Sequence, residues 1–188
     1  KAINVEEENA NYFSKDGVLF SGTTLKYCPG SDRQEYVIPD GITSISEFAF
    51  IDCGELTKIK MSNSVTSIGF AAFEGCSGLK KLELPTRVNG IQTRAFSGCS
   101  GLTEITFKGL APDFGEDAFS GVTATVYYPG NDSSWTEEVR QDYGGTLTWI
   151  SYVAEEIVDS GTCGENLTWT MERNGVLSIS GTGSMTDY

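Results

Sequence analysis

The sequence contains no histidine among its 188 residues. Without an imidazole the chain cannot assemble a Ser-His or Cys-His nucleophile, nor a metal site that depends on histidine ligands. Basic residues are also scarce, because 13 Lys and Arg stand against 26 Asp and Glu and give a net charge of −13. Since nucleic acids and anionic membranes attract proteins mainly through Lys and Arg, we expect neither as a partner.

Long apolar segments are missing as well. No run approaches the roughly 18 apolar residues that span a bilayer, so we expect no membrane insertion of this chain. The sequence starts at Lys1 without a positively charged and then apolar leader, so we interpret it as a processed form or an excised piece of a longer protein. Apolar residues make up 39% of the chain, enough for the core of one ordinary domain with or without a small module.

An internal repeat runs through the middle of the sequence. The Ala-Phe dipeptide recurs at intervals of 23 residues, as Ala49-Phe50, Ala72-Phe73, Ala95-Phe96 and Ala118-Phe119. Apolar columns keep the same interval, among them Cys53, Cys76 and Cys99; Leu56, Leu79 and Leu102; Tyr36, Ile59, Leu82 and Ile105; and Ile45, Ile68, Ile91 and Phe114. A unit this short cannot bury its own apolar side, so neighbouring units must stack and share one core.

Each unit predicts strands joined by a tight corner. The spacing of Leu56, Ile59 and Met61 alternates between inward and outward positions, as a strand of a parallel sheet requires. Val65 and Ile68 predict a second short extended stretch. The Ala-Phe-x-Gly-Cys corner predicts a short helical turn, with its glycine supplying a left-handed exit.

These units resemble the leucine-rich repeats of the BspA-like type, found in large bacterial surface proteins. The resemblance lies in residues 38–50 and 64–76 and covers roughly residues 36–130, whereas the unit after Phe119 departs from it, as a capping repeat would. It implies a right-handed leucine-rich-repeat solenoid, rich in strands with short helical turns. It also implies an extracellular or wall-attached location and a protein or glycan ligand on host or neighbouring cells.

The organisation that we predict has three parts. Residues 1–35 form a partial repeat, whose first strand holds Ile3 and Val5, and a β-hairpin over residues 17–27. Residues 36–153 form the solenoid, closed by a helix that opens with the capping box Ser134-Trp-Thr-Glu137 and by a strand over residues 146–153. Residues 154–188 form a linker and a partial β module.

The last part is predicted in more detail. Residues 154–160 form a polar connector, and Leu167–Met171 pairs with Val176–Ser180 through a turn at Asn174-Gly175. Since an isolated hairpin is marginal in water, the chain is either a monomer or associates weakly through this hairpin.

The sequence predicts no catalytic residue, no metal and no cofactor. Cys53, Cys76 and Cys99 are expected to stack as small buried thiols, because four converging zinc ligands are not available. A bridge between Cys28 and Cys163 and weak calcium binding by the loop acids around Asp113 are left open. The adjacent glutamates predict a solvated acidic surface rather than a catalytic pair.

Outward positions of the strands form the main candidate binding surface, and they are Glu35, Lys58, Lys60, Lys81, Glu83, Glu104 and Thr106. Five of the 13 basic residues lie in these segments, namely Lys58, Lys60, Lys80, Lys81 and Lys108. Adjacent strands would pair Glu35 with Lys58, Lys60 with Glu83, and Lys81 with Glu104, leaving the face neutral. Either a solubilising charge ladder or a mixed-charge surface for a protein partner is compatible with this pattern.

Aromatic residues near the end of the solenoid form a second candidate site, comprising Trp135, Tyr143 and Trp149. They either cover the exposed end of the core or stack on sugars or a protein.

We therefore predict a non-enzymatic surface module that binds proteins or host components. The alternatives are a structural spacer without a ligand and a carbohydrate-binding accessory of a larger surface enzyme. Adhesion predicts a saturable partner that is lost on changing Lys58, Lys60 and Lys81, which a spacer would tolerate. A carbohydrate-binding module predicts glycan affinity that is lost on changing exposed aromatics such as Trp135.

Overall fold

The computed structural model describes residues 2–30, 32–153, 157–164, 167–172 and 177–181. The chain divides into two compact units, Lys1–Tyr152 and Val153–Tyr188. All regular elements of the described residues are strands, and none is a helix.

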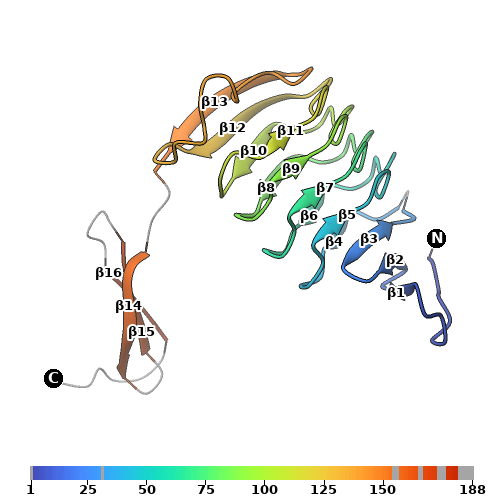
Figure 1. Cartoon of the computed structure of the whole chain (residues 1–188), viewed down its shortest axis with the longest axis horizontal. Coiled ribbons are helices and arrows are strands. Elements are labelled where there is room, and N and C mark those ends of the chain that lie inside the picture. The colour runs from blue at the N-terminus through green and yellow to red at the C-terminus, as the bar shows by residue number, and fades with distance from the viewer. Residues whose placement is uncertain (1, 31, 154–156, 165–166, 173–176, 182–188) are drawn as a thin grey trace. The chain divides into compact units, whose positions relative to one another are not determined.

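The first unit is a solenoid of stacked coils that contribute strands to two sides (Figure 1). One side, the back sheet, is a continuous seven-stranded sheet in the order β1-β2-β3-β5-β7-β9-β11. Its strands are β1 (Phe13–Lys15), β2 (Val18–Ser21), β3 (Thr24–Tyr27), β5 (Ser44–Ile45), β7 (Ser67–Ile68), β9 (Gly90–Ile91) and β11 (Asp113–Phe114). From β5 to β11 the strands pair in parallel with a register of 23 residues, which confirms the second extended stretch of each unit.

The other side, the front face, carries the longer strands. These are β4 (Glu35–Val37), β6 (Lys58–Lys60), β8 (Lys81–Leu84), β10 (Glu104–Phe107), β12 (Thr123–Pro129) and β13 (Thr146–Tyr152). The strand predicted over residues 146–153 is thus confirmed as β13, which pairs in parallel with β12. Strands β4, β6, β8 and β10 bury alternate residues, as in β6, where Ile59 is buried between two exposed lysines.

The core between the two sides is built from the repeated apolar columns. Phe50, Phe73, Phe96 and Phe119 are fully buried, and their rings stack at centroid distances of 4.7, 5.1 and 5.5 Å. Offset stacking of this kind adds to the stabilisation that burial of each ring provides. The predicted solenoid of shared-core repeats is therefore the observed fold.

The corners of the repeat are successive turns, so the predicted helical turns are wrong. Ala71 and the equivalent residue of the other corners adopt left-handed backbone angles, with φ between 49° and 58° at Phe48, Ala71, Arg94 and Asp117. A left-handed residue interrupts a helix. The backbone amides also bond between coils, since Phe73 N donates to Ala95 O at 2.8 Å. The predicted left-handed glycine exit is confirmed, for example at Gly75, whose φ is 75°.

The predicted helix after Ser134 is also absent from the described residues. The hydroxyl of Ser134 accepts the backbone amide of Ala111 at 2.8 Å, one coil earlier, instead of capping a helix. Ser134 in turn donates its own amide to the carboxylate of Asp132. The segment therefore follows the repeat and remains a series of turns, because its capping residue is used by a neighbouring coil.

At the other end, the hairpin expected over residues 17–27 is present as β2 and β3. Strand β1 extends it, and β3 continues into the back sheet by pairing in parallel with β5. No strand is formed at Ile3 and Val5, so that prediction is wrong. Ile3 instead donates its backbone amide to Gly17 O at 3.0 Å.

The second unit is an antiparallel sheet of β14 (Ile157–Gly164), β15 (Leu167–Glu172) and β16 (Leu177–Gly181). Pairing of Trp169 with Ile179 and of Met171 with Leu177 confirms the predicted hairpin strands. Its turn at Asn174-Gly175 lies outside the described residues. The polar connector is wrong from residue 157 onward, because β14 pairs with β15 there. The three-part division of the chain and association through this hairpin stay predictions.

Candidate functional site

The front face brings the seven predicted surface residues together. Strand alternation turns each of them outward, exposed or half-buried, while the intervening residues enter the core. They are Glu35, Lys58, Lys60, Lys81, Glu83, Glu104 and Thr106. Their position follows from the period of two along a strand, so the sequence was sufficient to place them.

The ion pairs between neighbouring strands differ from the predicted set at one place. The Lys58 Nζ–Glu35 Oε2 and Lys81 Nζ–Glu104 Oε2 distances are 3.8 and 3.0 Å, which confirms two pairs. The third is wrong, because Glu83 pairs with Lys108 at 2.6 Å. Among the described residues, no ion pair includes Lys60.

The reason is a break in the front face between β6 and β8. Strands β4 and β6 form one hydrogen-bonded pair, and β8, β10, β12 and β13 form a separate four-stranded sheet. Within the described chain, no backbone hydrogen bond joins β6 to β8. Lys58 and Lys81 are equivalent residues of these two strands, and like charges on adjacent strands are destabilising.

A groove with a volume of about 630 Å³ lies at the break. Its lining includes the buried residues Ile59, Met61 and Pro85, and five lysines with one glutamate. The charged residues are Lys58, Lys60, Lys80, Lys81, Lys108 and Glu83. When Glu35 and Glu104, the ionic partners of Lys58 and Lys81, are counted with Glu83, five lysines stand against three glutamates. The groove and its ionic partners thus carry a local excess of two positive charges in a chain of net charge −13.

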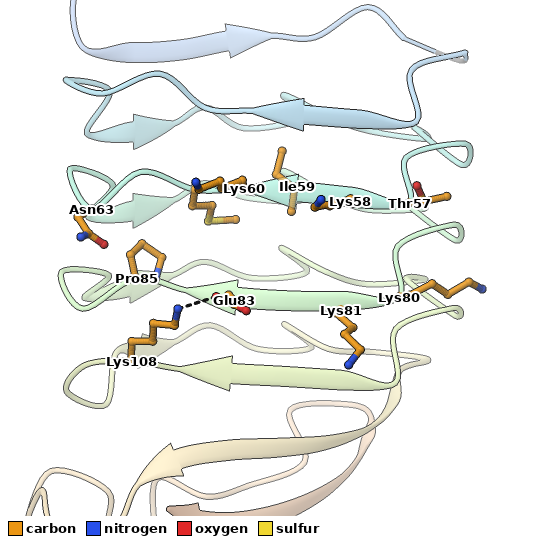
Figure 2. Close-up of a pocket in the computed structure, with 11 residues that line it drawn as sticks. Thr57, Lys58, Ile59, Lys60, Asn63, Lys80, Lys81, Glu83, Pro85 and Lys108 are labelled. Atoms are coloured by element: carbon orange, nitrogen blue, oxygen red, sulfur yellow. Dashed lines mark hydrogen bonds and ion pairs between the residues drawn. The ribbon is translucent and has the colours of Figure 1, made fainter. Parts of the chain in front are cut away.

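Figure 2 shows how the charged side chains are directed. Lys108 points at Glu83, and Lys81 points away from β6 toward the following strand. Lys60 lies beside the gap with no ionic partner among the described residues. The sequence pattern predicted a neutral face, because it assumed that every neighbouring strand would be paired. Pro85 cannot donate to a ladder, but it does not by itself mark the break, since Ser62 makes no equivalent backbone bond to Ile38 among the described residues and β4 and β6 still pair.

The predicted aromatic residues lie together. Trp135 belongs to the core, and Tyr143 and Trp149 are half-buried and pack against it. Trp135 is only 5% exposed, and its ring centroid lies 4.9 Å from that of Phe107 and 5.9 Å from that of Trp149. Tyr143 stacks on Phe114 at 4.3 Å. The indole nitrogen of Trp135 donates to Gly109 O at 3.0 Å. This geometry favours a cap over the core, because the rings pack against one another and against core phenylalanines.

The cysteine column consists of buried free thiols. Cys76 and Cys99 donate to the carbonyl oxygens of Phe50 and Phe73, each at 3.1 Å. Cys28 is also a buried free thiol, and burial raises the pKa of both Cys28 and Cys53 to about 11. The side chain of Cys163 lies outside the described part, so a bridge to it stays untested. Protonated, hydrogen-bonded thiols are structural in character.

The described residues offer neither a metal cluster nor a membrane-spanning helix. They contain no group of three or more Cys, Asp or Glu side chains arranged to hold a metal ion. Nor do they contain a helix with the length and hydropathy needed to cross a bilayer.

Comparison with known proteins identifies the repeat. The family described as the BspA type leucine rich repeat region matches residues 26–132 in six copies. No curated protein matches the chain in sequence.

Three solved structures show the same fold. A leucine-rich repeat protein from Eubacterium ventriosum is 23% identical, with a TM-score of 0.63 over 80% of this chain and 42% of its own. The pneumococcal vaccine antigen PcpA is 19% identical, with a TM-score of 0.51 over 81% of this chain and 51% of its own. The T. pallidum leucine rich repeat protein is 22% identical, with a TM-score of 0.50 over 78% and 83%.

The chain therefore spans about half the length of the first two of these proteins. The repeat match covers more than half of the present chain. With its stacked coils, buried phenylalanine column and parallel strands, the chain belongs to the BspA-type leucine-rich repeat family.

Proposed function

We propose that this chain is a non-enzymatic binding module of a bacterial surface protein and that it recognises a protein partner through its front face. The groove between β6 and β8 carries the proposal. It opens among outward side chains that no other part of the first unit covers, and it combines apolar residues with unpaired cationic ones. Its volume of about 630 Å³ falls within the size range that is usual for ligand sites.

The repeat architecture supports this function. Solenoids present extended faces that suit binding, since each coil repeats the same outward positions with different side chains. Location at the cell surface is supported by the family and by similarity to a protein described as a vaccine antigen. A vaccine antigen must be accessible outside the cell, so we extend that location to this chain.

Electrostatics supports a specific partner over a passive surface. Lys58 and Lys81 are balanced by Glu35 and Glu104, so these pairs contribute little to attraction. Lys60 has no such balance among the described residues. An acidic region of a partner would supply the missing counter-charge and would be drawn to the groove from solution.

A binding screen tests the proposal. The purified chain is presented to extracellular-matrix proteins, mucin and a glycan array at physiological salt, beside the variant Lys60→Glu/Lys80→Glu. The control is Lys15→Glu/Arg87→Glu, which makes the same change of charge at exposed residues that do not line the groove. We expect a saturable protein partner that the groove variant loses and the control keeps.

Other outcomes would overturn the proposal. Glycan binding that ignores the groove variant but is lost in Trp149→Ala would move the site to the aromatic cap and favour a carbohydrate-binding module. Absence of any saturable partner across the panel would favour a structural spacer.

A further inference from the structure

The front face changes its chemistry toward the last two strands of the solenoid, β12 and β13 (Figure 1). The outward positions of β8 and β10 include Lys81, Glu83 and Glu104. The outward positions of β12 and β13 carry no charged side chain, and they are Thr123, Thr125, Tyr127, Thr146, Thr148, Ile150 and Tyr152. This end of the face is therefore built from hydroxyl groups and aromatic rings instead of ion pairs.

Two consecutive tyrosines of β12 show how the strand sorts its aromatic rings. Tyr128 is buried and packs against Trp135 and Trp149 at centroid distances of 5.4 and 6.2 Å. Tyr127 is half-buried on the opposite face, because side chains alternate along a strand. Within the part of the chain that the structure describes, Tyr127 stacks on no other ring and its hydroxyl has no hydrogen-bond partner. Its ring and its hydroxyl are both available to a ligand.

A second tyrosine lies on the same hollow. The hollow has a volume of about 400 Å³, and its lining residues are Glu104, Thr106, Lys108, Tyr127 and Tyr152. Thr106 and Tyr127 are direct neighbours across β10 and β12. Tyr152 is fixed, because its hydroxyl donates to Phe107 O at 2.7 Å. Neighbouring strands thus hold two tyrosines and one threonine on a single surface.

The charged groups of the hollow are balanced by ion pairs. Lys81 Nζ lies 3.1 and 3.0 Å from the two carboxylate oxygens of Glu104, and Lys108 Nζ lies 2.6 Å from Glu83 Oε2. A charged ligand would compete with these partners and gain little from its charge. The pairs still leave oxygen lone pairs on Glu104 and N–H groups on Lys108 that can bond neutral groups. The hollow therefore favours an uncharged ligand with many hydroxyls.

A sugar ring matches this combination of groups. The axial C–H groups of a pyranose form an apolar and weakly positive face, which complements the negative face of an aromatic ring. Its hydroxyls donate and accept hydrogen bonds, so they suit a carboxylate, an ammonium and a threonine hydroxyl at once.

We infer that the hollow over β10, β12 and β13 binds an uncharged oligosaccharide. A sugar ring packs on Tyr127 and Tyr152, and its hydroxyls bond Glu104, Thr106 and Lys108. This site goes beyond the proposed function, because it lies on other strands than the β6–β8 groove and takes a ligand of another chemical class.

Isothermal titration calorimetry tests the site with three uncharged probes, namely cellotetraose, fully N-acetylated chitotetraose and mannotetraose. We expect at least one of them to bind saturably. Tyr127→Ala should weaken this binding about tenfold or more, because the stacking surface is lost. Tyr127→Phe keeps the ring and should weaken it only about threefold. The matched control is Tyr12→Ala, at an exposed tyrosine that does not line the hollow.

Two further readouts identify the mode of binding. Saturation transferred from the protein in NMR should be strongest at the sugar C–H protons that face the tyrosines, and it should fall in Tyr127→Ala. Because the ligand is uncharged, raising NaCl from about 0.05 to about 0.5 M should change the affinity by less than about twofold.

Folding is checked by thermal unfolding of every variant. If Tyr127→Ala unfolds early, Thr106→Val keeps the test valid, because it removes one hydroxyl at nearly constant volume. Thr106→Val should weaken sugar binding about threefold.

The inference is overturned if none of the three tetrasaccharides binds, if the folded Tyr127→Ala binds as the parent does, or if Tyr12→Ala loses binding equally. A steep loss of affinity at high salt would overturn it as well, because a charged contact would then be responsible. A protein partner that is lost in Tyr127→Ala, without any sugar binding, would assign the hollow to a protein interface and reject the sugar site.

Failure of this inference can be told from failure of the proposed function. Lys60→Glu/Lys80→Glu should lose the protein partner and keep the sugar. Sugar binding in the absence of any protein partner would reject the proposed function alone. A protein partner lost in that variant, with no sugar binding in the parent, would reject this inference alone.

Discussion

The back sheet and the front face arise from the same repeat, yet only the back sheet is continuous. Strands β3 to β11 pair without interruption, whereas the front face separates between β6 and β8. The same two coils stay in register because the corners and the back sheet join them on both sides of the gap. Stacking of the coils therefore depends on the core, the corners and the back sheet, and the front strands are free to differ for function.

The largest expected effect on stability comes from disrupting the core that the back sheet and the front face share. Phe73 is fully buried between the rings of Phe50 and Phe96. Replacing it by alanine should lower the free energy of unfolding by about 3–5 kcal/mol, since both buried surface and ring contacts are lost. Urea unfolding measures the change, and Phe48→Ala, at a 40% exposed side chain, is the control. Similar losses of unfolding free energy in both variants would contradict a phenylalanine stack that stabilises the core.

Close approach of the corners provides the next test. A Cβ at Gly101 would lie 2.2 Å from Ser77 O, whereas a Cβ at Gly90 in the back sheet would meet nothing within 4 Å. Gly101→Ala should therefore lose about 3 kcal/mol of unfolding free energy, because backbone must move. Gly90→Ala should change it by less than about 0.5 kcal/mol. Equal effects in thermal unfolding would contradict the tight contact between these coils.

The buried thiols predict a loss of stability in alkaline solution. Burial raises the pKa of Cys28 and Cys53 from 9.0 to about 11, so the folded state holds these protons above the pH at which the unfolded chain releases them. The contribution of the protonated thiols to the free energy of unfolding is complete below pH 9. It is lost as the pH rises toward 11, by up to about 2 kcal/mol for each thiol. Unfolding of Cys28→Ala/Cys53→Ala between pH 8 and 11 should show a shallower decline than the parent. Identical slopes would contradict the prediction.

The smallest effect sharpens the contrast within the front face. Lys81 has an ionic partner and Lys60 has none among the described residues. Lys81→Met should lower the unfolding free energy by under about 1 kcal/mol, as exposed pairs do, and this loss should shrink at high salt. Lys60→Met should leave stability unchanged at either salt concentration. A larger loss at Lys60 would indicate a partner in the folded protein and would weaken the proposed role of this lysine.

Where sequence reasoning was correct, the information lay in a repeated column. The Phe stack, the thiol column and the outward position of Lys58 and Glu104 all follow from one interval repeated along the chain. Where it was wrong, a local sequence pattern was interpreted without the contacts that the adjacent coil makes. Ser134 matches a helix cap by spacing, but its hydroxyl accepts a bond from Ala111 in another coil. The Ala-Phe-x-Gly-Cys corner, as in residues 72–76, suits a helical turn by residue type, but it forms successive turns that follow a left-handed residue, Ala71.

The sequence by itself determined the family, the stacking of coils and the side of each strand that enters the core. It could do so because a unit of 23 residues must repeat its apolar positions to share a core with its neighbours. Only the tertiary structure decided which strands bond and where the front face opens. Hydrogen bonding between strands depends on pairs of residues one coil apart. Among the described residues, Thr103 donates its backbone amide to Lys80 O, whereas Lys80 makes no such bond to Thr57.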